Sequence, residues 1–251
     1  MVFNVLGALY EAAELRRNEL RAYLDSKLDA LPDAYEYWFC HEGGDDSLST
    51  AALAAASGVS ELSGLRLTAI NTEVISDSDE IIEGSLLDVL KPHAGLKDRV
   101  RNLKAICEFR NSINAVNELK PDLLLMNGSL MGTVLRPVKY DGILGTDVKT
   151  WIRKNCLKKI TNSTDELSIH SRSFDGILRD TFRSYKPVVY LEGIEGLISI
   201  WKLLRKTKDI IAVSRRSTMS DIFEDMPDIT VFNDLTQGWA IPYPSTENSQ
   251  T

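Results

Sequence analysis

The sequence has few cysteines, few histidines and no long apolar run. Its three cysteines, Cys40, Cys107 and Cys156, are odd in number and widely spaced, which excludes a disulfide framework and a CxxC zinc site. The histidines are too scattered to predict a zinc site or a catalytic triad. No apolar run approaches the ~18 residues that cross a bilayer. We therefore expect a protein of a reducing interior that does not span a membrane.

Several common motifs are also absent. The sequence contains no GxxxxGK[ST] phosphate loop and no GxSxG nucleophile elbow, and its "EGIEG" segment lacks the GxGxxG spacing of dinucleotide sites. The N-terminus has no basic region before its apolar residues, and Glu11 and Glu14 come early. This is unlike a secretory signal peptide, so we expect a cytoplasmic location.

The chain has 251 residues, 43% of them hydrophobic and 26% charged, with a net charge of −7. This length and composition predict a soluble globular protein, and the acidic total makes non-specific DNA binding by the whole surface unfavourable. Two segments, 149–159 and 202–216, are nevertheless rich in lysine and arginine. Solvated helix faces are the simplest interpretation of both segments, and contacts with DNA phosphates are the alternative.

The order of apolar and polar residues predicts an α/β fold, a sheet with helices on its faces. Pro121 ends the predicted helix 99–119, and a buried strand follows it. Residues 139–187 show no clean period and are interpreted as a loop-rich insertion with short helices. Helices are predicted at 4–30, 99–119 and 194–206, and strands at 36–42, 65–75, 122–126, 186–193, 209–214 and 228–232.

Polar residues with oxygen-bearing side chains lie at or near the ends of these elements. Glu42 ends the strand in "FCHEGGDDS", Glu108 flanks the apolar stripe of helix 99–119, and Asn127 ends the strand in "LLLMNGS". Divalent ions prefer several converging oxygen ligands, and two such ions roughly 3.5–4 Å apart can hydrolyse a phosphodiester. Ordinary turn formation by Asn-Gly and Gly-Gly-Asp is the alternative explanation. Asp45 or Asp46 could replace Glu42 as the first ligand.

The order of these segments resembles the NurA family, nucleases that work with the HerA ATPase in DNA end processing. The resemblance covers about residues 36–242 and is most specific at 119–132. It rests on "HEGG", "CEFRNSINAVNELKPDLLLMNGSL", "IIAVSRRS" and "VFNDLTQGWAIP", which resemble the family's successive motifs.

The resemblance implies an RNase H-like mixed sheet with flanking helices and a helical N-terminal segment. It implies Mn²⁺ or Mg²⁺ as cofactor, and DNA, a HerA-like hexameric ATPase and a second copy of the chain as partners. The expected domains are a helical segment 1–35, a nuclease domain 36–244 that includes the insertion 139–187, and a disordered tail 245–251. The expected metal ligands are Glu42, Glu108, Asn127 and Asp234, and the expected DNA contacts are Arg215, Arg216, Lys154 and Lys158.

Two of these positions depart from the family pattern. Glu42 stands where aspartate is usual, and Asn127 stands where aspartate is nearly always found. An amide oxygen can bind a metal ion but adds no negative charge. We therefore predict a metal-dependent deoxyribonuclease whose activity is reduced by Asn127. The alternative is a catalytically inactive NurA-like subunit that binds DNA or an ATPase, and a third possibility is an unrelated α/β protein whose acidic turns are only turns.

Overall fold

A computed structural model describes residues 48–128, 130–163 and 168–213, helical positions between 14 and 29, and the segments 38–40 and 238–240. The chain divides into two compact units, residues 47–214 and a unit formed by 1–46 with 215–251. Several predictions concern positions outside the described residues: the strand 228–232 and the site residues Glu42, Asp45, Asp46, Arg215, Arg216 and Asp234.

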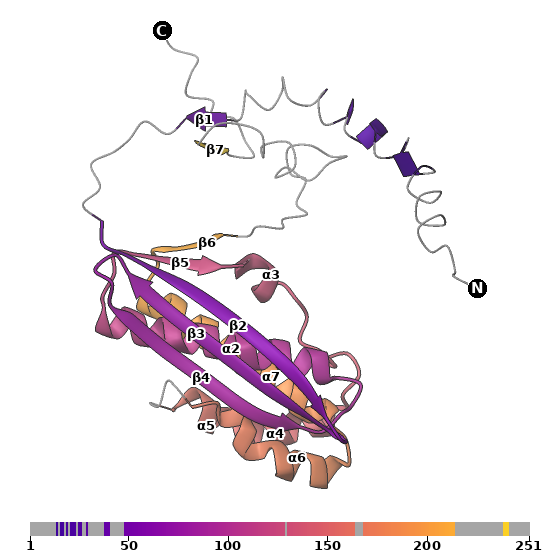
Figure 1. The fold of residues 1–251 in the computed structure, drawn as a ribbon. Helices are drawn as coiled ribbons and strands as arrows, with labels where there is room; N and C mark the ends of the chain where they lie inside the picture. The colour runs from indigo at the N-terminus through magenta and orange to yellow at the C-terminus, as the bar shows by residue number, and fades with distance from the viewer. Residues whose placement is uncertain are drawn as a thin grey trace. The chain divides into compact units, whose positions relative to one another are not determined.

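The larger unit is built on a five-stranded mixed sheet, with the strands in the spatial order β4-β3-β2-β5-β6 (Figure 1). β2, β3 and β4 are antiparallel neighbours, whereas β5 is parallel to β2 and β6 is parallel to β5. The parallel pairs place the carboxyl ends of β2, β5 and β6 in one direction. The strands are β2 (Thr50–Leu62), β3 (Leu65–Ser76), β4 (Ile81–Leu90), β5 (Leu123–Asn127) and β6 (Ile210–Val213).

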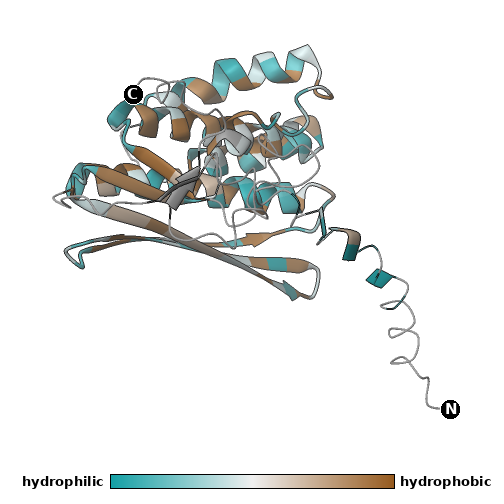
Figure 2. Ribbon diagram, turned by 90° about the horizontal axis from the view of Figure 1, so that it is seen from above, coloured by the Kyte–Doolittle hydropathy of each residue, from teal (hydrophilic) through white to brown (hydrophobic). Residues whose placement is uncertain are grey.

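Two long helices, α2 (Leu96–Glu118) and α7 (Lys186–Lys206), lie on one face of this sheet (Figures 1 and 2). Phe109 and Ile113 of α2 pack in one buried cluster with Leu124 of β5, because helical spacing directs them towards the sheet. Burial of each such side chain stabilises the fold by about 1.5–3 kcal/mol. The predicted α/β fold class, helix 99–119 and strand 122–126 are therefore confirmed.

The prediction for residues 186–206 is wrong in its first half. The predicted strand 186–193 is the beginning of α7, which runs unbroken to Lys206. Pro187 lies in the first helical turn, where its missing N–H costs nothing. The helical period was hidden because two buried positions of α7, Glu192 and Glu195, are glutamates.

These two glutamates are paired with arginines of α2. Arg99 donates from Nε to Oε1 of Glu192 over 2.7 Å, and Arg110 donates from Nη2 to Oε1 of Glu195. The carboxylate of Glu195 also accepts the backbone N–H groups of His170 and Ser171. Buried charges are tolerated only with such partners, so these pairs fix the position of α7 against α2.

Short helices follow β5. Those after α3 surround a second apolar cluster that includes Ile152, Cys156, Leu178 and Leu191. They are α3 (Leu130–Val134), α4 (Thr146–Ile152), the π-helical η1 (Arg153–Leu157), α5 (Lys158–Thr161), the 3₁₀-helical η2 (His170–Phe174) and α6 (Asp175–Phe182).

The described part of the second unit contains helical positions within the predicted helix 4–30 and a two-stranded sheet. β1 (Trp38–Cys40) lies in the predicted strand 36–42 and pairs in antiparallel fashion with β7 (Gly238–Ala240), with Phe39 opposite Trp239. Across both units, the described residues include no helix that combines the length and the apolar composition needed to cross a bilayer.

Candidate functional site

A pocket lies beside the carboxyl end of β5, between that strand end, α2 and α3. We call it the strand-end pocket, and its volume is about 220 Å³. Glu108 and Asn127, two of the predicted metal ligands, both line it. The other lining residues are Arg101, Lys104, Ala105, Phe109, Met126, Gly128, Leu130, Thr133 and Ala212.

Asn127 is the last residue of β5, and its position depends on the turn that follows. Gly128 has a φ of +113°, which L side chains rarely adopt, and its N–H donates to the carbonyl of Val213 on β6 over 2.8 Å. The chain therefore leaves the sheet immediately after Asn127 and places this residue at the pocket wall. The turn requires a glycine at position 128. The residue before it, Asn127, is polar because its side chain lies at the pocket wall.

Glu108 reaches the same pocket from α2, where it is half-buried beside Lys104. The Nζ atom of Lys104 lies 3.5 Å from Oε1 of Glu108, one helical turn away. Burial raises the pKa of Glu108 above its ordinary value, and the positive charge of Lys104 partly offsets this effect. A partly desolvated carboxyl group in a pocket is typical of a functional site.

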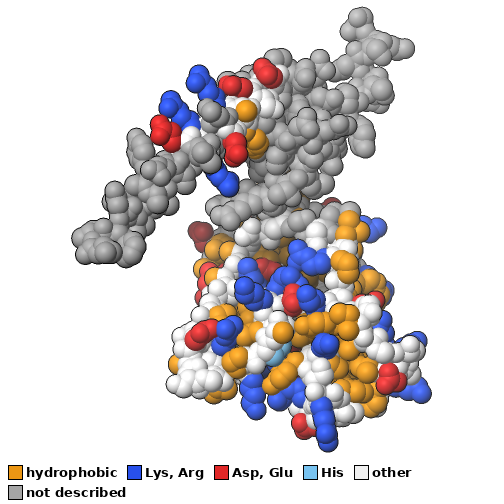
Figure 3. Space-filling view, turned by 90° about the vertical axis from the view of Figure 1, so that its right-hand side faces the viewer, with side chains coloured by type: hydrophobic (Ala, Val, Ile, Leu, Met, Phe, Trp, Pro, Cys, Tyr) orange, Lys and Arg blue, Asp and Glu red, His pale blue; other side chains and the backbone are white. Residues whose placement is uncertain are grey.

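Two cations of the pocket, Arg101 and Lys104, were not predicted from the sequence. The α2 residues at positions 101, 104, 105 and 108 all line the pocket, and Arg101 and Lys104 are two of them. Their separations are three or four residues. This is the spacing of one helix face, and it could have been read from the position predicted for Glu108. Figure 3 shows lysine and arginine side chains gathered on one face of the described part of the molecule.

Strand β2, the neighbour of β5, contributes no carboxylate at this level. Leu53 of β2 is paired with Met126, and the next three residues of β2 are Ala54, Ala55 and Ala56. The first acidic residue of β2 is Glu61, near the far end of the strand. The strand beside the pocket therefore presents only methyl groups where a metal site needs oxygen atoms.

The pocket residues do not fit a pair of divalent metal ions. Their oxygen donors are one carboxylate, Glu108, which is already paired with Lys104, and one neutral amide, Asn127. Two hard ions need several oxygen ligands, and negative charge among them is the main source of affinity. Among the described residues, no group of three histidine, cysteine, aspartate or glutamate side chains could hold a metal ion.

The remaining predicted DNA contacts lie elsewhere. Lys154 and Lys158 line a separate hollow of about 610 Å³ with Lys159 and His170. In the second basic segment, the ammonium group of Lys202 donates to the carbonyls of Ile160 and Ser163. Lys206 donates to the side chain of Asn117, and Arg205 stacks on the ring of Trp201.

Comparison with known proteins identifies relatives of the whole fold. A family model described as the NurA domain matches residues 47–246. The NurA nuclease from Sulfolobus solfataricus superimposes with a TM-score of 0.68 at 19% identity, over 96% of this chain and 70% of that one. A NurA structure bound to dAMP and manganese gives a TM-score of 0.60 at 14% identity, over 90% and 70%. No curated protein sequence matches the chain.

Proposed function

Because the chain belongs to the NurA family, a family with solved nuclease structures, we propose that it binds DNA at the strand-end pocket as a subunit that does not itself hydrolyse it. One observation carries this proposal: the pocket combines two cations, Arg101 and Lys104, with a single carboxylate. Phosphate groups are attracted to such a balance of charge, whereas divalent ions are not.

Lys104 is the residue on which the proposal depends most. Its ammonium group is the counter-ion of Glu108, and only a third of its side chain is exposed. Lys104 adds one positive charge to the pocket, whereas two divalent ions would add four. A lysine can neutralise a phosphate oxygen, but it does not generate a metal-bound hydroxide at neutral pH. The described residues of the pocket therefore favour binding of a phosphate over activation of water.

A metal-dependent deoxyribonuclease is the second candidate. It is favoured because Glu108 and Asn127 line the same pocket, and because a related NurA structure contains manganese and dAMP. In this case Glu108 and Asn127 would hold Mn²⁺ or Mg²⁺, which would activate water for phosphodiester hydrolysis. Further carboxylates would then have to come from outside the described residues, with Glu42, Asp45, Asp46 and Asp234 as the candidates.

Either function is compatible with the partners that the family resemblance implies. We propose a homodimer and a HerA-like hexameric ATPase as the assembly in which the protein handles DNA ends. A subunit without hydrolytic activity would hold the DNA strand while the ATPase moves it. Co-purification and sizing of the protein with such an ATPase would test this part of the proposal separately.

Fluorescence anisotropy of a labelled single-stranded oligonucleotide tests DNA binding, with EDTA or Mn²⁺ present. We expect equal affinity in both buffers and no release of nucleotides with Mn²⁺. Lys104→Ala should weaken binding and lower the slope of log affinity against log salt by about 0.7, the value for one lost phosphate contact. Lys208→Ala is the matched control, since Lys208 is exposed and lies just before β6, at the opposite end of the strands.

Two results would decide against the proposal. Absence of DNA binding by the intact protein would remove any role in holding DNA. Steady release of nucleotides with Mn²⁺, lost in Glu108→Gln, would establish the nuclease instead.

A further inference from the structure

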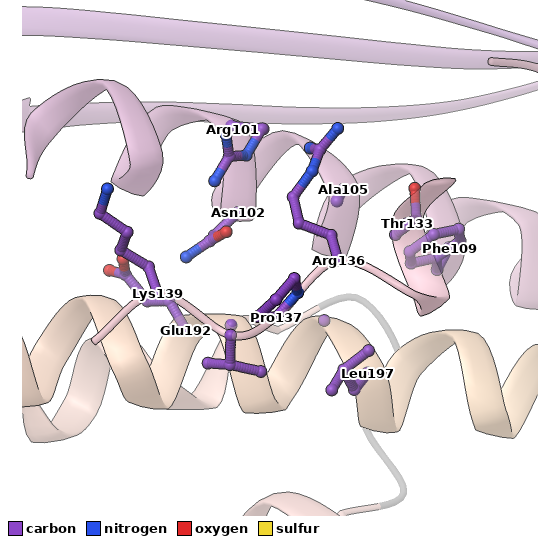
Figure 4. Close-up of a pocket in the computed structure, with 13 residues that line it drawn as sticks. Arg101, Asn102, Ala105, Phe109, Thr133, Arg136, Pro137, Lys139, Glu192 and Leu197 are labelled. Atoms are coloured by element: carbon purple, nitrogen blue, oxygen red, sulfur yellow. The ribbon is translucent and has the colours of Figure 1, made fainter. Parts of the chain in front are cut away.

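A second hollow lies next to the strand-end pocket, between α2 and α7 (Figure 4). We call it the α2–α7 hollow, and its volume is about 80 Å³. Arg101, Ala105 and Phe109 line both spaces, so the two adjoin along one face of α2. With ~30 Å³ per water molecule, the hollow admits one small polar group and not a duplex.

The wall of the hollow opposite α2 is formed by α7 and the segment 136–139. This segment lies directly against α7, because a Cβ atom at Gly193 would come within 2.8 Å of Cγ1 of Val138. The contact fixes the position of two cations at the hollow, Arg136 and Lys139. Figure 4 shows Arg101 and Arg136 on the same side of this space, which Lys139 and Glu192 also line.

Of the described residues, Glu192 is the one acidic residue that lines the hollow, and it is fully buried. Its Oε1 atom accepts the hydrogen bond from Arg99, whereas no described residue forms a hydrogen bond with its Oε2 atom. Burial raises the pKa of Glu192 to about 8, although Arg99 opposes this shift.

Asp98 limits the positive potential of the hollow. Its carboxylate pairs with Arg101 over 2.7 Å and with Lys139 over 3.5 Å. Arg136 is exposed and forms no ion pair with the described residues. The described cations along the two spaces are thus Arg101, Lys104, Arg136 and Lys139, against the carboxylates of Glu108 and Asp98.

We infer that a single DNA strand runs along α2 from the strand-end pocket to the α2–α7 hollow, where Arg136 and Lys139 bind a second phosphate. This inference rests on the proposed function, since it extends the same DNA-binding site. Single-stranded DNA fits because a cationic groove that follows the backbone is sufficient for its binding. Arg101, which lines both spaces, lies between the two phosphates.

The test is the salt dependence of single-stranded DNA binding by the full-length protein. The double substitution Arg136→Ala with Lys139→Ala should weaken binding and reduce the log–log salt slope by about 0.7, the value for one lost phosphate contact. Asp98→Asn should strengthen binding by about two- to five-fold, because it releases Arg101 and Lys139 from a surface ion pair. Thermal melting by circular dichroism checks that each variant is folded.

The outcomes separate this inference from the proposed function. If Lys104→Ala weakens binding and the Arg136/Lys139 double variant binds like the wild type, the hollow is not part of the site and only this inference fails. If the intact protein binds no DNA, the proposed function fails. An equal loss in Lys208→Ala would show that binding follows total charge, which also overturns the assignment of the hollow.

Discussion

Removal of the buried carboxylate of Glu195 should destabilise the larger unit more than any surface substitution. Glu195 is fully buried on α7. Its Oε1 atom accepts from Arg110 and from the N–H of His170 over 2.8 Å, and its Oε2 atom accepts from the N–H of Ser171 over 2.7 Å. One side chain therefore holds together α2, α7 and the beginning of η2.

The magnitude follows from what Glu195→Ala leaves behind. Arg110, whose side chain is only 6% exposed, loses its ion pair with Glu195, and breaking a buried pair costs about 3–5 kcal/mol. Two backbone N–H groups also lose their acceptor, at about 1–3 kcal/mol each if water cannot reach them. These costs overlap, so we expect a loss of about 5 kcal/mol. For a unit of this size that corresponds to a fall of roughly 10–20 °C in the melting temperature.

Urea and thermal unfolding, followed by circular dichroism, measure this loss. The matched control is the double variant Glu195→Met with Arg110→Leu, which removes both charges together. It should recover the share of the loss that comes from the broken ion pair, whereas the N–H groups of His170 and Ser171 still lack their acceptor. A loss below about 1 kcal/mol in Glu195→Ala, or a double variant as unstable as the single one, would refute the reasoning.

Two further predictions concern charge at the site and beneath it. Asn127→Asp adds a negative charge to the strand-end pocket, so it should weaken DNA binding, measured by anisotropy. It should produce no cleavage with Mn²⁺, measured by nucleotide release. A large gain in cleavage would instead establish Asn127 as a metal ligand. The pKa of Glu192 is raised from 4.5 to about 8 in the folded protein, so the native state holds more protons than the unfolded chain between these values. The free energy of unfolding should therefore fall as pH rises through this window, by roughly 3–5 kcal/mol at most. Glu192→Gln should flatten this dependence of stability on pH. The same slope in both proteins would exclude this carboxyl group as the cause.

The sequence predicts the elements whose burial is apolar and periodic. Helix α2 and strand β5 were found because Phe109, Ile113 and Leu124 follow helical or strand spacing. Helix α7 was misread because Glu192 and Glu195 occupy core positions, and only the arginines of α2 make that burial possible. Such pairs join residues about 90 positions apart, so no local pattern reveals them.

Strands β2 and β4 were not predicted, for different reasons. β2 is rich in alanine and contains Gly58, both of which have low strand propensity, and it is a strand because β3 and β5 pair with it on both sides. β4 alternates only weakly, with Gly84 packed against the side chain of Thr72. In both cases the tertiary pairing overrides the local preference.

The candidate site was half predictable. Asn127 and Glu108 were identified from strand-end chemistry and family resemblance, and the structure places both at one pocket. Arg101 and Lys104 were not identified, because a cation on an amphipathic helix is usually a solvated residue. Their importance depends on which strand end the helix face meets, and this is a property of the fold.

The net charge of −7 and the proposed DNA site are consistent because potential is local. A neutral amide at Asn127 and methyl groups along β2 each remove negative charge that a divalent ion would need. The same absence lowers the repulsion that a phosphate would meet, while Arg101 and Lys104 continue to attract it. Among the described residues, the low negative charge of the pocket therefore disfavours a divalent ion and favours a phosphate through one electrostatic balance.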